Sequence, residues 1–435
     1  MTLAEWKNKN SIYKKYAHFD KRVMINDVWD YISNPKRVAK HGFYPFIHYT
    51  QIFKKYKKSE GAVQKEREIC YSAHLDRCIF QYYSFLLNEK YNSRVIRDGI
   101  SNVSVAYRNN LGLNNIDFSK SIFDFIRKFE SCYIMVGDFT KFFDNLDHAY
   151  LKKQLCNLLE VDKLEDDYYA VYKNITSYSK WELSDLLILN GLSNSKSDIK
   201  KLNSQDSVLT LKQFKKYKKQ YVTPHSESYG IPQGSAISAV LANVYMLDAD
   251  KEIYDYVNYH NGIYMRYSDD FIIVIPSKKE DFNIHYNWIK KYLETLPGVE
   301  LSPEKTKLFR YCDSTVVSCN NEFESNINND KNILNFLGFS FNGKEVTIRD
   351  KTISKYYYRM YRKAHTINKN GFVSPKGKRI SCKNLYEKYS VRGAKGEKGN
   401  FLTYVYRANN AYNGQEPINR STKNHMYKIY KKLNK

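Results

Sequence analysis

Long apolar runs are absent from this sequence of 435 residues. No stretch of 18 apolar residues occurs, and the first residues lack the apolar core of a secretory signal peptide. The seven cysteines form neither a CxxC pair nor a cluster with histidines at zinc-binding spacing. We therefore expect a cytoplasmic protein that spans no membrane and whose cysteines stay reduced.

Acidic residues are scarce at the end of the chain. Residues 351–435 contain 21 basic, 3 acidic and 11 tyrosine residues, so +18 of the total net charge of +24 lies there. Cations interleaved with aromatic rings suit a polyanion whose bases can stack. A solvated basic surface is the alternative, because Lys and Tyr are abundant throughout the chain. A membrane surface is disfavoured, since no amphipathic basic helix dominates. We expect a nucleic-acid partner.

Helical and strand-like patterns alternate between residues 132 and 345, which predicts an α+β core with flanking helices. The expected helices cover 65–92, 144–159 with Asp144 as N-cap, 234–257 and 285–296. The expected strands cover short pieces within 93–110, then 132–139, a β-hairpin at 263–275, a loop and strand at 301–312, and a strand pair that opens at 336–341. Residues 160–225 are polar and uneven and are interpreted as an insertion, 320–332 as an exposed loop, and the rest as a basic helical tail.

Two adjacent aspartates, Asp269 and Asp270, interrupt an apolar run at 262–275. A buried carboxylate is costly unless it is paired or metal-bound, so these acids either lie in a turn exposed to water or hold a cation. Asp138 ends a second apolar strand in the same way. Three carboxylates at the ends of adjacent strands could hold two Mg²⁺ ions, which suits in-line displacement at phosphorus. An ordinary acidic turn is the alternative for the pair taken alone.

A glycine-rich segment, Gly-Ile-Pro-Gln-Gly-Ser at 230–235, precedes one of the expected helices. Glycines allow close approach of a ligand to the backbone, and a helix N-terminus favours anions. Gln233 could hydrogen-bond a base or a sugar without adding charge.

Five segments in order resemble the palm motifs of reverse transcriptases: VGDFTKFFDNLDH, GIPQGSAIS, YSDD, LSPEKTK and FLGFSF, over roughly residues 137–341. The Pro-Gln-Gly loop and the YxDD box favour this family over viral RNA-dependent RNA polymerases. The resemblance implies an RNA-directed DNA polymerase with a right-hand fold in the α+β class. Its domains would be an N-terminal helical region and fingers at 1–131, a palm at 132–345 whose insertion at about 160–225 contributes to the fingers, and a basic helical thumb at 346–435.

The resemblance also implies roles for single residues. Asp138, Asp269 and Asp270 would bind two Mg²⁺ ions, or Mn²⁺ in their place, with the Phe139 carbonyl as a further ligand. Phe143 would exclude the 2′-hydroxyl of ribonucleotides, with a core aromatic as the alternative.

Further roles concern the nucleotide and the primer. Gln233 and Gly234 would line the nucleotide and the template position, and Lys305 would lie near the leaving pyrophosphate, with Lys307 as competitor. The fingers arginine for the triphosphate would be Arg108, with Arg94 and Arg97 equally available. Three residues would grip the primer: Leu337, Gly338 and Phe339.

The segments at 65–92 and 399–413 resemble bacterial defence-associated, abortive-infection reverse transcriptases, several of which use a dedicated non-coding RNA against phages. We therefore expect an RNA template, dNTPs and a DNA primer or cDNA product as partners, and an oligomer or accessory protein stays open. A retron-type enzyme is the alternative, although 94 residues here separate Asp138 from Pro232 and retron enzymes are generally more compact. Template-independent synthesis, priming by a tyrosine and a catalytically inactive binding scaffold also remain open.

Overall fold

Five antiparallel strands form the central sheet, in the order β6-β7-β3-β8-β9. The computed structural model describes residues 2–57, 61–324, 327–373, 377, 379–380 and 382–433. Strand β3 (Ser131–Asp138) lies between β7 (Asp270–Ile275) and β8 (Lys307–Cys312), and the edges are β6 (Ile263–Tyr267) and β9 (Thr315–Ser318). The expected strand at 132–139 and the hairpin at 263–275 are confirmed.

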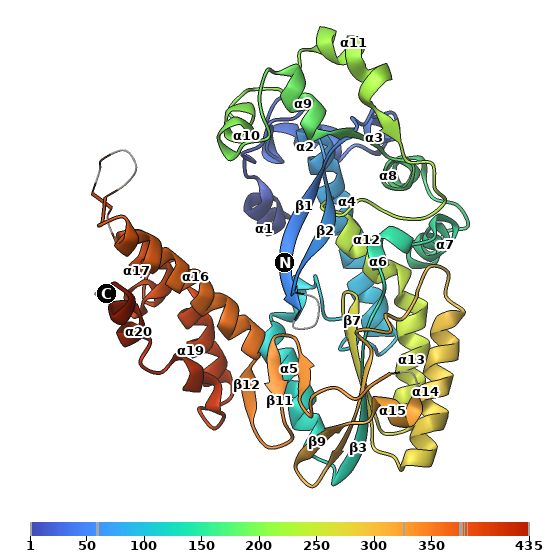
Figure 1. Ribbon diagram of the computed structural model, residues 1–435. Helices are drawn as coiled ribbons and strands as arrows, with labels where there is room; N and C mark the ends of the chain where they lie inside the picture. The colour runs from blue at the N-terminus through green and yellow to red at the C-terminus, as the bar shows by residue number, and fades with distance from the viewer. Residues whose placement is uncertain are drawn as a thin grey trace.

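The apolar run of β3 is explained by burial on both faces of this sheet. Tyr133 and Met135 belong to a core with helices on one face, whereas Cys132 and Ile134 belong to a second core on the other. The helices that pack against the first face include α4 (His74–Arg97), α7 (His148–Leu159), α12 (Ser238–Tyr245), α13 (Leu247–Tyr259) and α14 (Lys279–Glu294) (Figure 1). The second face is covered by α5 (Asn115–Ile126) and by a small three-stranded sheet.

A long β-hairpin of β1 (Phe46–Lys57) and β2 (Gly61–Tyr71) rises beside the central sheet (Figure 1). β1 also pairs in parallel with β4 (Ser179–Glu182), which pairs with β5 (Thr223–Pro224), so part of the expected insertion joins the sheet of the hairpin. The insertion otherwise forms α8 (Asp166–Thr176), α9 (Leu183–Leu189), α10 (Lys196–Leu202) and α11 (Leu211–Tyr221). Its buried Trp181 packs with Phe19 and Ile47 in a core of its own.

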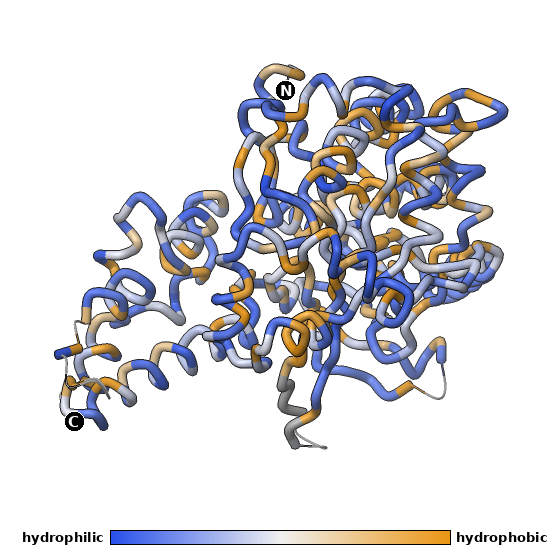
Figure 2. Tube along the Cα trace, turned by 90° about the horizontal axis from the view of Figure 1, so that it is seen from above, coloured by the Kyte–Doolittle hydropathy of each residue, from blue (hydrophilic) through white to orange (hydrophobic). Residues whose placement is uncertain are grey.

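The C-terminal region begins with the small sheet of β10 (Leu334–Phe336), β11 (Phe339–Phe341) and β12 (Val346–Ile348). The expected basic helical tail follows as α16 (Asp350–Lys369), α17 (Lys383–Tyr389), α18 (Val391–Ala394), α19 (Phe401–Ala411), the 3₁₀ segment Pro417–Thr422 and α20 (His425–Leu433). Seen from above, these helices project to one side of the main body, with hydrophilic and hydrophobic segments alternating along them (Figure 2).

Short elements complete the chain: α1 (Leu3–Asn10), α2 (Trp29–Ile32), α3 (Pro35–Ala39), α6 (Phe142–Asn145), α15 (Asn320–Phe323), and the 3₁₀ turns Asn26–Val28 and Asn109–Leu111. In the described ranges, no helix is long and apolar enough to cross a membrane. All seven cysteines are free thiols, as expected.

Several sequence-based boundaries were wrong. Residues 65–71 belong to β2 rather than to a helix, because most of this strand is exposed and so lacks a buried apolar face. Within 93–110 no strand forms; residues 93–97 end α4, and turns and an isolated bridge of Ser104 to Arg266 follow. The N-cap of α7 is Asp147, whose carboxylate accepts a hydrogen bond from the Tyr150 amide at 2.7 Å, and Asp144 lies inside α6.

Other boundaries need smaller corrections. The helix expected at 234–257 is divided into α12 and α13, and residues 234–237 precede it as a turn. The helix expected at 285–296 begins earlier, at Lys279. The segment 320–332 starts with α15 and is otherwise loop where it is described; residues 325–326 of this expected loop lie outside the described residues.

Candidate active site

The three aspartates singled out in the sequence lie at one end of the central sheet. Asp138 is the last residue of β3 and Asp270 is the first of β7, and the two are Cα partners in the antiparallel register. Asp269 lies in the turn between β6 and β7, where its carbonyl accepts a hydrogen bond of 3.2 Å from the Phe139 amide. The structure therefore brings the three acids together, as the ends of adjacent strands should.

A buried ion pair supports the turn that carries Asp269. The Arg266 guanidinium donates a hydrogen bond of 2.8 Å to Asp250 and one of 2.9 Å to the carbonyl of Ser268, and Arg266 and Asp250 are fully buried. Burial alone would lower the pKa of Arg266, but the Asp250 carboxylate raises it above its ordinary value. Ser268 takes a left-handed backbone conformation, with φ of 64°. The pair thus fixes a turn that would be costly to form unsupported.

The acids of this edge repel one another. Removal of water by the surrounding protein, together with the charges of Asp269 and Asp138, raises the pKa of Asp270 to about 7, although part of its side chain still reaches solvent. The Lys305 ammonium forms an ion pair with Asp138 and offsets part of this negative charge. Carboxylates held this close favour a bound cation.

The donor set fits a hard divalent cation. It consists of carboxylate oxygens, which Mg²⁺ and Mn²⁺ prefer. Among the residues that the structure describes, no three Asp, Glu, His or Cys side chains already surround a common metal position. Lys305 lies against Asp138 in this arrangement. A cation bound at Asp138 would therefore replace the Lys305 ammonium there.

Phe139 lies between the end of the sheet that carries the three acids and the core. Its ring is buried against Phe142 and Phe271 at centroid distances of 5.4 and 5.3 Å. Gly137 makes room for this packing: a Cβ atom there would lie 2.2 Å from the ring of Phe271, its register partner. The glycine of the VGD motif is therefore required by the aromatic packing beneath Asp138.

The glycine-rich loop is fixed between β2 and α6. The Gln233 carbonyl accepts a hydrogen bond of 2.8 Å from the Cys70 amide, and the Ile231 amide donates one of 2.9 Å to the Phe143 carbonyl. Gly234 has φ of 109°, and a Cβ atom there would lie 2.5 Å from the Cys70 carbonyl oxygen. The side-chain amide of Gln233 donates a hydrogen bond of 3.1 Å to the Asp144 carboxylate. The loop thus joins the β1–β2 hairpin to α6, which follows the end of the sheet that carries the acids (the acid-bearing edge).

These elements surround one cleft of about 690 Å³, a size that suits a nucleotide. Phe143, Gln233 and Gly234 line it, as do Asp269 and Lys305. Strand β2 contributes four charged side chains, those of Lys65, Glu66, Arg67 and Glu68. The cleft therefore combines acids, a half-buried aromatic ring, a side-chain amide and cations around one space.

The prediction that Arg108 binds a triphosphate must be corrected, because Arg108 is not among the residues that line this cleft. Its side chain is 3% exposed and donates to the Asn92 side chain at 2.8 Å and to the Ser104 carbonyl at 3.0 Å. Burial lowers its pKa. The two alternatives are also engaged elsewhere, Arg94 with Asp98 and Arg97 with Glu160.

Lys65 and Arg67 are the cations that sequence reasoning missed, because residues 65–71 were assigned to a helix. The segment KEREICY has four charged residues followed by three apolar ones, so it lacks the alternation of period two that indicates a half-buried strand. Lys305 rather than Lys307 faces the acids, since Lys307 lies 3.7 Å from Asp330.

Leu337, Gly338 and Phe339 lie at the turn between β10 and β11, apart from the residues that line the cleft. Leu337 and Gly338 have φ of 45° and 93°. The Leu337 carbonyl accepts a hydrogen bond of 2.9 Å from Asn115 on α5, and the Phe339 ring is buried. The structure therefore places these residues in a rigid turn beside the start of the C-terminal helices.

A family profile described as reverse transcriptase (RNA-dependent DNA polymerase) matches residues 57–341, more than half of the chain. The chain belongs to this family. Membership carries with it the right-hand polymerase fold expected from the sequence. No match was found among curated proteins.

Solved structures of telomerase from two Candida species match this chain. Apo telomerase from Candida tropicalis, truncated from its C-terminal domain, aligns with a TM-score of 0.45 and 13% identity over 75% of this chain and 61% of that one. Telomerase from Candida albicans, in complex with a TWJ fragment of telomeric RNA, aligns with a TM-score of 0.41 and 14% identity over 100% of this chain and 70% of that one. The chain thus spans about six-tenths of the first of these proteins, and the family assignment rests on the profile.

Proposed function

We propose that this reverse transcriptase synthesises DNA on an RNA template by adding dNTPs to a primer 3′-hydroxyl. The observation that carries the proposal is a single cleft lined by Asp269, Lys305, the Gln233–Gly234 loop and the cations of β2. Asp138 adjoins it through its ion pair with Lys305 and is the register partner of Asp270. Divalent cations held by Asp138, Asp269, Asp270 and the Phe139 carbonyl would activate the hydroxyl and neutralise the leaving pyrophosphate.

Other side chains at the cleft bind the nucleotide and assist the leaving group. Lys65 and Arg67 hold the triphosphate in place by charge. The Phe143 ring restricts the space beside the sugar, so that a 2′-hydroxyl collides with it. Gln233 positions the base or sugar through its amide, and Lys305, already in contact with Asp138, holds a proton at the leaving pyrophosphate.

The domains proposed from the sequence are compatible with these roles. Residues 1–131 form the helical N-terminal region and the fingers, 132–345 the palm, and 346–435 the thumb. Pairing of β4 with β1 supports the assignment of the insertion at about 160–225 to the fingers. The turn at Leu337–Phe339 grips the primer strand where palm and thumb meet.

Cations on the thumb would follow the duplex backbone. Lys355, Arg359 and Arg362 are exposed on α16, whereas Tyr356, Tyr357 and Met360 of the same helix are buried in the thumb core. The basic side of this helix therefore faces solvent, as phosphate binding requires.

The sequence resemblance extends the proposal to antiphage defence in the bacterial cytoplasm, with a dedicated non-coding RNA as template. A retron-type enzyme would instead copy a structured RNA that primes its own synthesis. A template-independent or protein-primed polymerase would use the same acids without reading a template.

The experiment is dNTP incorporation by the protein purified with its associated RNA, with Mg²⁺ or Mn²⁺ and with sequencing of the product. Asp269→Asn is the inactive variant, and Asp255→Asn on the exposed side of α13 is the matched control. Product that maps to the co-purified RNA and is absent only with Asp269→Asn supports the proposal. Homopolymeric product from both the Asp255→Asn and the unmodified protein would replace the proposal with untemplated synthesis. Product that is still made by Asp269→Asn protein would overturn the assigned site.

A further inference from the structure

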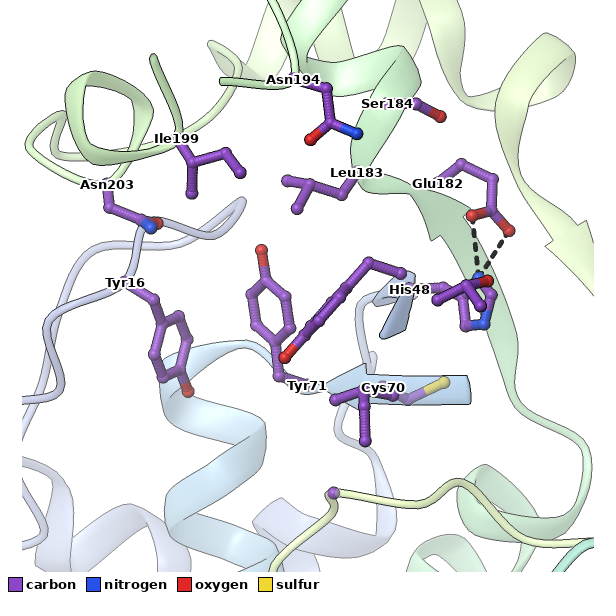
Figure 3. A pocket seen from close by; sticks show the side chains of 14 residues that line it. Tyr16, His48, Cys70, Tyr71, Glu182, Leu183, Ser184, Asn194, Ile199 and Asn203 are labelled. Atoms are coloured by element: carbon purple, nitrogen blue, oxygen red, sulfur yellow. Dashed lines mark hydrogen bonds and ion pairs between the residues drawn. The ribbon is translucent and has the colours of Figure 1, made fainter. Parts of the chain in front are cut away.

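A second cavity, of about 660 Å³, adjoins the active-site cleft at Ile69 and Gly234, which line both. Three segments far apart in the sequence form its walls (Figure 3): Tyr16 near the N-terminus, Tyr49 and Tyr71 on the β1–β2 hairpin, and residues 183–203 of the insertion. Neither the acids nor the loop of the proposed mechanism requires this space.

One face of β2 connects the two cavities. Alternate residues of a strand point to the same side, so Lys65, Arg67, Ile69 and Tyr71 share a face. Lys65 and Arg67 line the active-site cleft, Tyr71 lines the second cavity, and Ile69 lines both. Tyr49, the register partner of Ile69, extends this face across the hairpin. A nucleic-acid strand that leaves the cleft along this face of β2 passes from cations to aromatic rings.

The walls of the second cavity suit an uncharged planar ligand. Among the described residues that line it there is no Lys or Arg, so a phosphate has no counter-charge there. The rings of Tyr16 and Tyr71 lie edge to face at 5.0 Å. Figure 3 shows the Tyr71 hydroxyl and the Asn194 amide directed into the cavity. Aromatic faces with amides and hydroxyls at their margin are the means by which proteins bind unstacked bases.

The cavity is held open by contacts between its walls. The ring of His48 lies between the carboxylates of Glu68 and Glu182, with Nδ1 2.7 Å from Glu182, and so ties β4 to the hairpin (Figure 3). The Tyr16 hydroxyl donates to the Ser72 carbonyl at 3.0 Å, and the Asn203 side chain accepts from the Ala17 amide at 3.0 Å. The N-terminal segment, the hairpin and the insertion are therefore fixed to one another.

We infer that this cavity, the base pocket, binds one unpaired nucleobase of the RNA just ahead of the copied position. The inference rests on the proposed function and on the template position that the resemblance gives to Gln233 and Gly234, and it adds recognition of an uncopied base. Charge separation along β2 favours RNA over a free nucleotide: a base in the pocket leaves its neighbouring phosphates near Lys65 and Arg67.

The test is photo-crosslinking with primer–template duplexes that carry 4-thiouridine at one position of the 5′ overhang at a time. Asp269→Asn protein is used without dNTPs, so that binding is measured whether or not polymerisation occurs. We expect a crosslink to peptides containing Tyr49 or Tyr71 from one overhang position only. Tyr49→Leu and Asn194→Ala should weaken binding of the overhang duplex about fivefold or more, with no change for a blunt duplex.

Tyr259→Ala is the matched control, because Tyr259 is 82% exposed on α13. Crosslinks spread evenly over the overhang, or equal affinities of Tyr49→Leu and Tyr259→Ala protein for it, would overturn the inference. Free nucleoside monophosphates could also be added as competitors. If they abolish the crosslink at concentrations that leave duplex binding intact, the inference is overturned and the pocket is assigned to a free nucleotide. Failure of the proposed function is distinct, since it would appear as absent dNTP incorporation with blunt and overhanging templates alike.

Discussion

Lys305 and Asp138 form an ion pair although 167 residues separate them in the sequence. The pair exists because β3 ends beside the loop that precedes β8, and the Ser302 amide donates to the Asp138 carbonyl at 2.8 Å. The amine of Lys305 is half exposed and so can leave Asp138 for an incoming nucleotide.

Lys305→Ala should therefore lower kcat for dNTP incorporation about 100-fold or more, in the range of lost general-acid catalysis, with a smaller change in KM. Single-turnover incorporation kinetics measure this. Lys307→Ala is the control and should stay near the unmodified rate, because Lys307 faces Asp330. Equal losses in both variants would contradict the assignment of Lys305.

Phe143→Val should reduce discrimination against ribonucleotides, because it removes the ring that closes the sugar side of the cleft. We expect the ratio of kcat/KM for dNTP over rNTP to fall about tenfold or more. Phe125→Val, at a half-buried position on α5, serves as the control for loss of an aromatic ring. An unchanged ratio in Phe143→Val would make this residue a core aromatic only.

Gly137→Ala should destabilise the protein by about 1–3 kcal/mol, since its Cβ would overlap the ring of Phe271. Denaturant unfolding measures the change. Gly42→Ala introduces a Cβ with nothing within 4 Å and should leave the free energy of unfolding nearly unchanged. Equal stability of the two variants would show that the sheet absorbs the overlap.

Asp250→Asn should cost about 3–5 kcal/mol of stability, because it leaves the buried Arg266 charge without its carboxylate. Thermal unfolding of the variant is compared with Asp255→Asn, which alters an exposed residue of the same helix. The turn at Ser268–Asp269 should loosen as well, so the activity of folded Asp250→Asn protein should fall. Full activity in that variant would contradict the role of the pair in supporting the turn.

Removal of Arg359 and Arg362 together should weaken binding of an RNA–DNA duplex. Each lost phosphate contact should also reduce the slope of log affinity against log salt concentration by about 0.9. Lys291→Ala, an exposed change on α14, should leave the slope unaltered. A slope that stays constant in the double variant would place the duplex elsewhere.

The acid-bearing edge was predictable because its determinants are local. One apolar run ends in Asp138 and another begins at Asp270, and the order of the motifs indicated their common sheet. The β1–β2 hairpin was not predictable in the same way, because most of β2 is exposed and carries charges that read as a helix surface. Arg108 failed as a candidate because its burial depends on distant contacts: the fold covers it and gives it hydrogen bonds to Asn92 and Ser104.

The parallel pairing of β1 with β4 has a consequence for the order in which the chain folds. Phe46 pairs with Lys180, and β4 in turn pairs with β5 at Thr223–Pro224. The sheet that presents Lys65 and Arg67 is therefore complete only after the ribosome has released residue 224. The hairpin can pair locally, but the second edge of β1 must wait for more than a hundred further residues to be made, and pairing over such a separation is slow. The sheet that presents Lys65 and Arg67 is thus completed after the strand that carries Asp138 has already been made.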